Sequence, residues 1–500
     1  LPRTLEVFRA WGVVDRFLAE GTFVSRPRFW VPGESAPRGG LDLGFLREFT
    51  AYAGVLILPQ DKTERLLYEH VSRTGLAEVR FGHRVIGFDQ DDSGVTVMVQ
   101  PQQGAAYELR TEYLVGCDGA HSAVRGALGW SLEGKTYPTR LMLADVRLPD
   151  QRNELPWPRF ASVSNGVLAA IRIEPELWRI IATLAPEARE EDVTREPEIA
   201  VQVQLLFGSG PFELVWADVF RIHCRNSPHF RQGRVLLAGD AAHLNSPAGG
   251  MGMNSGIQDA HNLAWKLARA IEGGPAGSDR ADRPWRDAPG GKTDREALLA
   301  SYEEERRPAV VTNVDRYTDL LTRGVLLAPP LVRTLFLGAA GIAVRQRALM
   351  RRAGPRMAML DTRYCSRLII GSGRWLGARA PDGVLRRGDG GEVRLLDLAS
   401  REAALLLFDD GRLPRWDVPQ VQGLLSGIPR LRVYRVLIAG ATPVAPEDLW
   451  DVTGAIWRAW QPSLSGTAAL IRPDGHVGWT SEGVLPEELR KGVGRALGVT

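Results

Sequence analysis

The chain has 500 residues, of which 44% are hydrophobic and 24% charged, which are ordinary proportions for a soluble globular protein with more than one domain. Its 62 basic and 59 acidic residues give a net charge of +3 without a long basic run, so nothing indicates nucleic acid as a partner. The three cysteines lie far apart in the sequence and form neither a disulfide framework nor a metal cluster. We therefore expect a reducing, cytoplasmic location and no metal site.

The first 140 residues carry the alternating signals of an α/β unit. Apolar residues at helical spacing predict a helix over residues 4–20, and a second helix is expected over 63–73, just after Gln60. Residues 78–99 read as a β-hairpin with a turn at Asp91–Gly94. A strand ending at Cys117 is followed by an Asp118-Gly119 turn and a helix from Ser122, which the Asp118 side chain is able to cap. Cys117 is expected to be buried and unreactive.

The central stretch 234–274 combines a buried strand, a glycine turn and a helix. The apolar run 235–238 is short enough for a fully buried strand, and Gly239-Asp240 places a carboxylate at its C-terminal end. Glycines follow at 249, 250 and 252, and apolar residues then recur at helical spacing from Met253 onward. Ligands of open α/β sheets sit at the carboxyl ends of the strands, and the first N–H groups of a helix favour negative charge. The stretch therefore predicts a site for a polyol beside a group that becomes anionic.

The remaining segments differ in character. Strand-like runs separated by acidic, proline-containing loops cover 141–223 and predict an antiparallel sheet. Residues 273–293 read as a flexible surface insertion, residues 294–307 as a helix, and 310–357 as mostly helical. The apolar run 325–344 is interrupted by Arg333 and by prolines, so membrane contact is not expected. A linker then precedes a last unit with strands at 403–408, 431–438 and 467–471 and a hairpin turn over 472–479.

Two of these motifs resemble those of the para-hydroxybenzoate hydroxylase family, the single-component flavoprotein aromatic hydroxylases. One is the sequence Gly239-Asp240-Ala241-Ala242-His243, continued by Pro247, Gly250-Met251-Gly252-Met253-Asn254, Asp259 and Asn262 to Leu267. The other is the Asp118-Gly119 motif, and Ser301 to Pro308 adds a weaker match. Met251 replaces a glutamine common in relatives, a change expected beside the flavin ring. A plain strand–turn–helix remains the alternative for a glycine pattern alone.

The resemblance implies an α/β fold: a FAD-binding doubly wound sheet, an inserted antiparallel substrate-domain sheet and a C-terminal thioredoxin-like domain. The corresponding ranges are 1–140 and 226–370 for the FAD-binding parts, 141–225 for the substrate sheet, and 371–500 for the C-terminal domain. The last range contains no cysteine, which excludes dithiol chemistry there and favours a packing or dimer role.

The activity implied by the resemblance is hydroxylation of an aromatic substrate, phenolic or polyketide-like, through a flavin hydroperoxide. FAD, NADPH or NADH, and dioxygen are the implied partners, with a monomer or homodimer as the assembly. Two alternatives stay open: epoxidation or Baeyer–Villiger oxygen insertion on the same fold, and a non-catalytic pseudoenzyme scaffold.

The resemblance also implies roles for individual residues. Asp240 and Gln60 would contact the ribityl chain, Val85 the adenine through its backbone, and Asp118 the pyrophosphate region. The N–H groups of Gly252, Met253 and Asn254 would stabilise negative charge on the reduced flavin, and Pro247 would line the substrate side of the ring. Val85 equally fits ordinary strand core, and Gln60 an ordinary surface position.

The start of the chain differs from the family pattern. No G-x-G-x-x-G follows a predicted strand, although that turn normally carries the FAD pyrophosphate. The segment from Leu1 resembles the part of the family that follows the first βαβ unit. We therefore expect such a unit, of about 30 residues or more, upstream of Leu1.

Overall fold

The computed structural model describes residues 1–37, 39–163, 166–272, 294–329, 346–411, 416–441, 448–463, 466–483 and 486–499, with four single residues between 330 and 345. The expected insertion at 273–293 and most of the apolar run 325–344 lie outside the described residues. Within them, no helix has both the length and the apolarity needed to cross a membrane.

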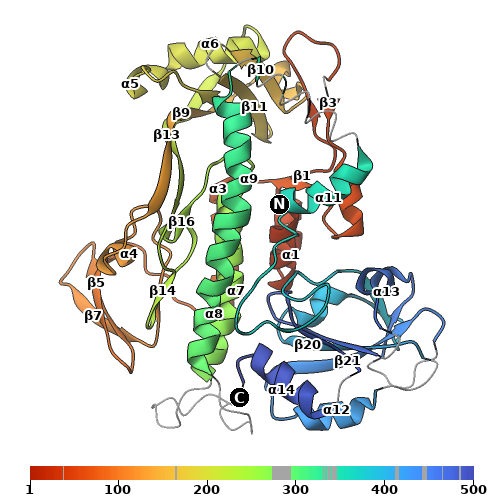
Figure 1. Cartoon of the computed structure of the whole chain (residues 1–500). Coiled ribbons are helices and arrows are strands. Elements are labelled where there is room, and N and C mark those ends of the chain that lie inside the picture. Colours follow the sequence, from red (N-terminus) through yellow and green to blue (C-terminus); the bar gives the residue numbers. More distant parts are fainter. Residues whose placement is uncertain are drawn as a thin grey trace.

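The lower body in Figure 1 is built on two packed helices and a small sheet. Helix α7 (Gly252–Glu272) packs against α8 (Arg295–Pro308) beside a sheet with the order β14 (Arg231–Gln232), β15 (Val235–Leu237), β8 (Leu114–Gly116). Strands β15 and β8 are parallel, with Leu237 opposite Gly116. Every residue of β15 is fully buried, as its short apolar run predicts. This parallel pair determines where the residues after Gly116 and Leu237 lie.

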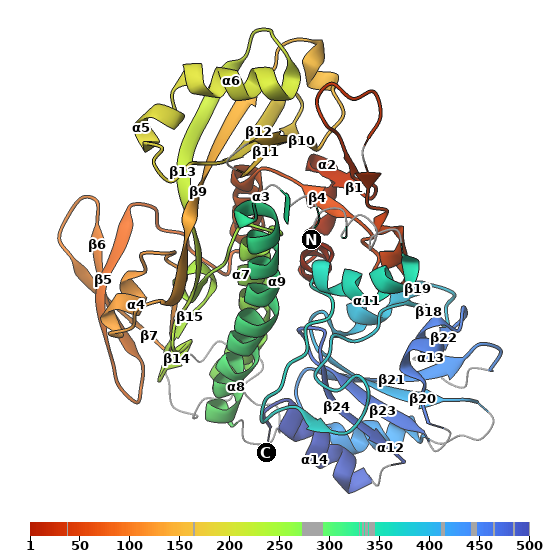
Figure 2. The same ribbon diagram turned by 45° about the horizontal axis from the view of Figure 1, so that its top comes forward.

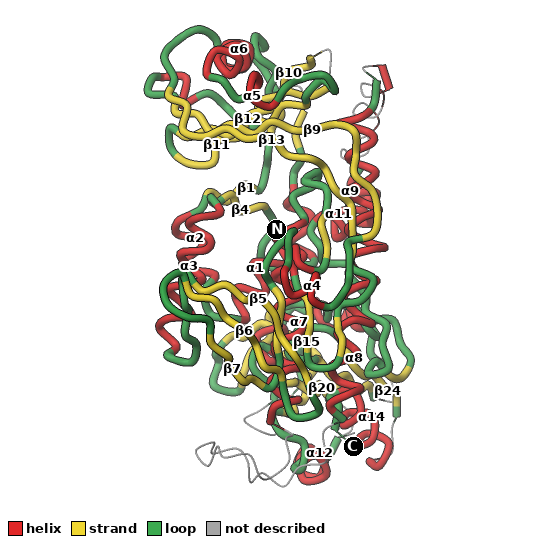
Figure 3. Tube along the Cα trace, turned by 90° about the vertical axis from the view of Figure 1, so that its left-hand side faces the viewer, coloured by secondary structure: helices red, strands yellow, loops and turns green. Residues whose placement is uncertain are grey.

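The upper body is one antiparallel sheet with a helix on one face, as Figure 2 shows. Its strand order is β10 (Arg159–Val163), β11 (Gly166–Glu174), β12 (Leu177–Thr183), β9 (Glu133–Arg147), β13 (Glu213–Asn226), β16 (His243–Leu244). Helix α6 (Glu196–Phe207) buries Ile199, Val203 and Leu206 in a cluster with Met142, Trp178 and Ile180 of the sheet. The predicted antiparallel sheet is therefore confirmed. Strands β9 and β13 also continue down into the lower body, as the side view in Figure 3 makes plain.

A helical column joins the two bodies. Helix α8 continues through the π-helical segment η4 (Ala309–Val314) into α9 (Asp315–Leu321) and a second π-helical segment, η5 (Thr322–Leu327). Figure 1 shows this column running from the small lower sheet to the antiparallel sheet above. Side chains of α9 thereby reach the loop that follows β15.

The expected helix over 4–20 is divided into α1 (Pro2–Ala10) and α2 (Val14–Glu20). Gly12 adopts a φ of +76°, and the N–H of Val13 donates to the Phe8 carbonyl at 2.9 Å. A left-handed glycine with this bond is a common helix C-terminus, and the hydrophobic spacing gave no sign of it. Both helices still bury one shared apolar cluster, which contains Leu5, Phe8 and Phe17.

The other predicted elements of the first 140 residues lie close to their expected positions. Helix α3 (Gln60–Thr74) begins three residues earlier than predicted. The hairpin of β5 (His83–Gln90) and β6 (Val95–Pro101) is extended by β7 (Tyr107–Thr111), and α4 (Ala123–Ala127) follows the Asp118-Gly119 turn. The remaining short elements are β1 (Thr22–Val24), β2 (Arg28–Phe29), β3 (Gly39–Gly40), η1 (Leu43–Glu48), β4 (Val55–Ile57), η2 (Gln151–Glu154), α5 (Glu190–Val193), η3 (Gly239–Ala241) and α11 (Arg347–Met357).

The C-terminal unit is a sheet with helices on its faces. Its order is β17 (Ile370–Gly371), β24 (Val477–Glu482), β23 (Thr467–Ile471), β20 (Ala403–Asp409), β21 (Leu431–Ile438), β22 (Leu449–Asp451), β18 (Val384–Arg387), β19 (Glu392–Arg394). Helices α12 (Val418–Leu425), α13 (Ala455–Trp460) and α14 (Pro486–Ala496) and the short η6 (Leu395–Ala399) complete it. Strands β20 and β21 are parallel, whereas β20, β23 and β24 are antiparallel. The thioredoxin-like description and the domain boundaries at 140, 225 and 370 stay predictions.

Candidate functional site

Two predicted carboxylates lie at the same edge of the lower sheet. Asp118 follows β8 and Asp240 follows β15, and the paired residues Gly116 and Leu237 end these neighbouring parallel strands. The N–H of Ala238 donates to the Gly116 carbonyl at 3.0 Å and extends the pairing by one step. Both acidic residues are exposed. The strand geometry therefore brings together two side chains that are 122 positions apart in sequence.

Asp240 is open for a ligand. In the part of the chain that the structure describes, its carboxylate has no hydrogen-bond partner. Partial burial raises the pKa of Asp240 and the negative charge of Asp259 adds to the rise, while His243 opposes it. A carboxylate in this setting gains from a hydroxyl donor because it accepts hydrogen bonds that the protein does not supply.

The turn around Asp240 depends on close backbone packing. Gly239 has a φ of +61°, in the left-handed region that glycine adopts without strain. A Cβ on Gly256 of α7 would lie 3.2 Å from the Gly239 Cα, so the helix and the turn meet at two glycines. This contact places the first turn of α7 directly against the Asp240 loop.

The start of α7 provides free backbone donors. The N–H of Ser255 donates to the Met251 carbonyl at 2.8 Å, so the N–H groups of Gly252, Met253 and Asn254 precede the first helical hydrogen bonds. The segment from the end of β15 through the first turn of α7 contains Asp240, Pro247 and these three N–H groups. Pro247 and Met253 are exposed on its surface. The predicted anion-stabilising groups therefore adjoin the open carboxylate.

Two side chains of this loop are structural. The Asn254 side chain is buried; its oxygen accepts from the Thr4 hydroxyl at 2.5 Å and its nitrogen donates to the Gly250 carbonyl at 2.7 Å. Met251 is buried with Val314 and Met359, where an apolar side chain is stable. Its expected position beside the flavin ring stays a prediction.

Gln60 and Val85 lie on neighbouring elements. Gln60 is exposed in the first turn of α3, and Leu58 just before it shares an apolar cluster with Ile257 of α7. Val85 is half-buried in β5 and packs on the cluster that contains Val124 and Leu237. The Val85 side chain is thus strand core, while the proposed adenine contact concerns its backbone.

Asp118 caps the following helix. Its carboxylate accepts from the N–H of Val124 at 3.1 Å and from the Ser122 hydroxyl at 2.5 Å, and Ser122 accepts from the N–H of Arg125 at 3.0 Å. The predicted capping role is present, and the exposed side of Asp118 still faces solvent at the sheet edge.

Cys117, expected to be buried, is exposed. The side chain falls beyond the last paired residue of β8, where the chain leaves the sheet. Desolvation at the sulfur and the negative charges of Asp259 and Asp118 raise the pKa of its thiol. A raised pKa disfavours the thiolate, so the expectation of low reactivity is unchanged.

Three buried residues that carried no predicted role hold the turn in place. Asp259 of α7 accepts from the N–H of Gly239 at 3.0 Å, from His243 at 2.7 Å and from the Arg306 guanidinium at 2.7 Å. Asp259, His243 and Arg306 are 0–1% exposed. All three are within the quoted family motifs, but sequence spacing alone does not show that they meet.

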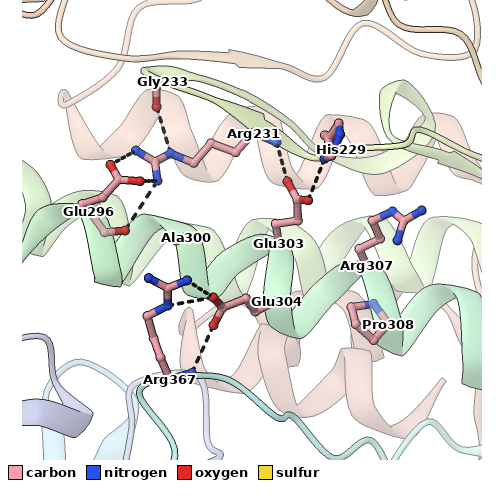
Figure 4. Close-up of a pocket in the computed structure, with 10 residues that line it drawn as sticks. All are labelled: His229, Arg231, Gly233, Glu296, Ala300, Glu303, Glu304, Arg307, Pro308 and Arg367. Atoms are coloured by element: carbon pink, nitrogen blue, oxygen red, sulfur yellow. Dashed lines mark hydrogen bonds and ion pairs between the residues drawn. The ribbon is translucent and has the colours of Figure 1, made fainter.

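A separate hollow lies along α8 (Figure 4). It has a volume of about 460 Å³ and is lined by charged side chains, among which Arg231 pairs with Glu296, Arg367 with Glu304, and His229 with Glu303. None of the predicted site residues lines this hollow. Among the described residues, no group of three or more His, Cys, Asp or Glu side chains could hold a metal ion.

The loop at Asp240 fits a flavin. An open carboxylate suits a ribityl hydroxyl, positive-φ glycines allow close approach of a flat ring, and free helix N–H groups suit a ring edge that gains negative charge. These features define the class as a flavin-dinucleotide-binding α/β protein, which also has a separate antiparallel sheet and a C-terminal unit.

Comparison with known proteins agrees with this class. Residues 1–284 match the FAD binding domain family and residues 373–499 match the family described as aromatic-ring hydroxylase, C-terminal. A flavin-dependent monooxygenase of Mycobacteroides abscessus is 30% identical over 96% of this chain and 88% of its own length. The 12-dehydrotetracycline 5-monooxygenase/anhydrotetracycline 6-monooxygenase of Streptomyces rimosus is 32% identical over 96% of this chain and 86% of its own.

A solved structure is similar along the whole chain. The flavin-dependent monooxygenase PieE, in complex with FAD and substrate, has a TM-score of 0.78 and 25% identity, and the match covers 99% of this chain and 91% of that one. The chain belongs to the FAD binding domain family of the aromatic-ring hydroxylases. It is a FAD-dependent monooxygenase, and the resemblance seen in the sequence is confirmed.

Proposed function

We propose that this protein hydroxylates a bulky aromatic substrate of the phenolic or polyketide type, with NADPH or NADH as the reductant and dioxygen as the oxygen source. The tetracycline-type names of its relatives support the substrate class, and a relative described as a probable NADH-specific resorcinol 4-hydroxylase supports a nicotinamide reductant. A cytoplasmic location, with a monomer or homodimer as the assembly, belongs to the same proposal.

The cofactor would be held by the loop that joins β15 to α7. In this proposal Asp240 and Gln60 accept or donate hydrogen bonds at the ribityl chain, Asp118 lies towards the pyrophosphate, and the backbone of Val85 lies towards the adenine. The N–H groups of Gly252, Met253 and Asn254 stabilise negative charge at the ring edge, and Pro247 lines its substrate side. The single observation that supports this most is the open Asp240 carboxylate beside the start of α7.

Bound FAD would supply the redox chemistry and the activation of dioxygen. The chain's own contribution is binding, orientation and charge. The antiparallel sheet of β9 to β13 stands above the cofactor loop, so its side chains would exclude water and position the aromatic ring. Epoxidation or Baeyer–Villiger insertion on the same fold is less favoured, because relatives are described as a putative polyketide hydroxylase and a probable resorcinol 4-hydroxylase.

Replacing Asp240 tests the proposed cofactor site. Asp240→Ala removes an acceptor that would bond a ribityl hydroxyl, and a hydrogen bond to a charged group contributes about 1.5–3 kcal/mol. We expect FAD affinity to fall by roughly one to two decades, measured by quenching of flavin fluorescence. Asp192→Ala, at a partly exposed carboxylate of α5, is the control and should bind FAD as the wild type does. Unchanged affinity in Asp240→Ala would rule out this loop as the ribityl site.

A further inference from the structure

The charge of His243 follows from its two hydrogen-bond partners. The side chain is fully buried beneath the Asp240 turn, with its ring stacked near Phe230. Its Nε2 lies 2.7 Å from the Asp259 carboxylate and its Nδ1 lies 2.9 Å from the Asn245 side-chain oxygen. A neutral imidazole has one donor and one acceptor nitrogen. If both partners of the ring are hydrogen-bond acceptors, both nitrogens must carry hydrogen and the ring is positively charged.

The Asn245 amide can point only one way. Its nitrogen donates to Asp315 Oδ1 at 2.7 Å, and the other oxygen of Asp315 accepts from the Asn226 amide at 2.7 Å. A carboxylate between two amides accepts from both, so the Asn245 nitrogen must face Asp315 and its oxygen must face His243. A flipped Asn245 amide would set its oxygen against an oxygen of the Asp315 carboxylate, and that repulsion excludes the other orientation.

The second partner of His243, the Asp259 carboxylate at Nε2, is also a hydrogen-bond acceptor. Its carboxylate receives the Gly239 N–H and the Arg306 guanidinium in addition to His243. Burial raises the pKa of Asp259, while the charge and hydrogen bond of the buried Arg306 guanidinium, 2.7 Å away, lower it and hold the carboxylate ionised. An ionised carboxylate cannot donate to Nε2. Both ring nitrogens of His243 must therefore carry hydrogen.

We propose that His243 is a buried imidazolium that acts as a positioning residue for the cofactor turn, keeping Asp240 ionised and favouring a ligand that becomes anionic at the start of α7. This inference rests on the proposed function of the Asp240 loop. Desolvation lowers the pKa of His243, but the charge and hydrogen bond of Asp259 outweigh it and leave the pKa raised, while Arg306 opposes and Asn245 supports the rise. The charged groups around the ring are Asp240 of η3, Asp259 of α7 and Arg306 of α8, with Asp315 of α9 behind Asn245.

His243 supplies the second cation beside the carboxylates of this loop. Asp259 also pairs with Arg306, so the charge of the imidazolium is available to offset the Asp240 carboxylate. Without the imidazolium, burial and Asp259 would both favour the protonated form of Asp240. A protonated Asp240 would lose its charge-assisted hydrogen bond to a polyol hydroxyl.

His261 of α7 is a matched control for His243 of β16. It is also buried, but its Nδ1 accepts from the indole N–H of Trp11 at 3.2 Å and therefore carries no hydrogen. Desolvation lowers the pKa of His261 to about 3. Of these two buried histidines, His243 is therefore expected to be positively charged and His261 to be neutral.

The first test measures the charge directly in the unaltered protein. After selective ¹⁵N labelling of the eight histidines, His243→Gln and His261→Gln assign the two signals. At pH 7.5 we expect the imidazolium shift at both nitrogens of His243 and a neutral ring at His261. A neutral His243 at pH 7.5 overturns the proposal, whether or not the variants fold well.

The second test measures the effect on the cofactor. The affinities of oxidised FAD and of dithionite-reduced FAD are compared in wild type, His243→Gln and His261→Gln. A unit charge acting over roughly 10 Å at an effective dielectric constant of about 20 changes an equilibrium about tenfold, so His243→Gln should lower the preference for reduced FAD by about tenfold. His261→Gln should leave that preference unchanged.

The two possible failures are distinguishable. If Asp240→Ala weakens FAD binding but His243→Gln keeps the wild-type preference for reduced FAD, the cofactor site stands and the role of His243 is refuted. If Asp240→Ala has no effect on FAD binding, the proposed site itself is wrong.

Discussion

At the scale of single residues, Asp259 is the side chain on which the cofactor turn depends. It joins the N–H of Gly239, the ring of His243 and the guanidinium of Arg306, and these groups come from three separate elements. Removing one partner of a buried charge pair leaves the other charge without compensation, which costs far more than loss of an exposed pair. This difference leads to a quantitative prediction.

Asp259→Asn should lower the free energy of unfolding by about 3–5 kcal/mol, because Arg306 would remain buried without its counter-ion. Glu78→Gln, which breaks the exposed pair with Arg80, should leave the free energy of unfolding nearly unchanged, because water screens an exposed pair. Urea denaturation followed by fluorescence measures both. Equal effects in the two variants would contradict the central position of Asp259.

The same residue sets a pH dependence. Its folded-state pKa of about 2 lies below the ordinary value, so its contribution to stability is present above the unfolded pKa of roughly 4 and is lost as the pH falls towards 2. Between about pH 4.5 and 6 this contribution should be constant, because Asp259 is ionised and His243 is charged in both the folded and the unfolded chain over that range. The deficit of Asp259→Asn in urea denaturation should therefore shrink in acid, and also above about pH 6.5, as the pH rises from the unfolded pKa of His243 through its raised folded pKa.

At the scale of elements, α7 is placed by its contact with the Asp240 turn. Gly239 and Gly256 meet with no side chain between them, and a Cβ at Gly256 would come within 3.2 Å of backbone that the left-handed Gly239 cannot easily shift. The first turns of α7 therefore pack directly on the backbone of the Asp240 turn, which keeps the free N–H groups of the helix near Asp240.

Gly256→Ala should separate the helix from the turn. Overpacking costs about 1–3 kcal/mol and alanine returns about 1 kcal/mol of helix propensity, so we expect a net loss of about 1 kcal/mol together with weaker FAD binding. Gly423→Ala in α12 has open space at its Cβ and should instead raise stability by up to about 1 kcal/mol. Thermal unfolding and FAD titration check both. A gain in stability for Gly256→Ala would show that the Asp240 turn shifts to make room for the Cβ, and would contradict the tight contact between Gly239 and Gly256.

At the scale of the whole molecule, the C-terminal unit is docked by a buried network of charges. The guanidinium of Arg472, in the hairpin turn between β23 and β24, bonds both oxygens of Glu305 of α8 at 2.7 Å and also contacts Asp474. Asp474 in turn accepts from Asn262 and Trp265 of α7, and Lys266 of α7 donates to Glu305. Helices α7 and α8 thus hold the cofactor turn at one end and the C-terminal hairpin further along.

Arg472→Met should loosen this docking. Loss of the buried cation leaves Asp474 and Glu305 undercompensated, at a cost of about 3 kcal/mol or more. We expect amide hydrogen exchange to rise by about a hundredfold in residues 472–478 and in α1, whose Arg3 guanidinium donates to the Asp474 carbonyl. Arg435→Met breaks a buried pair with Asp448 inside the C-terminal sheet and should raise exchange only in β21 and β22. Increased exchange confined to the C-terminal sheet in both variants would contradict a docking role for Arg472.

Local patterns in the sequence were sufficient to predict most of the helices and strands named above and part of the candidate cofactor site. The buried strand before Asp240, the glycine turn, the start of α7 and the strands β20, β21 and β23 all agree with prediction to within one or two residues. Such features depend on side-chain period and backbone freedom within a few residues, which the sequence states directly. The adjacency of Asp118 and Asp240 was not predicted, because it depends on the pairing of β8 with β15, two segments that are distant in the sequence.

Only the tertiary structure decided which buried polar groups meet. Asp259 finds His243 across 16 positions and Arg306 across 47, and Asn262 finds Asp474 across 212. Partner choice among buried charges depends on packing between distant elements, because each such group must find a counter-charge wherever the fold places one. For the same reason the sequence motif showed that His243 is present, whereas only its neighbours Asn245 and Asp259 determine its charge.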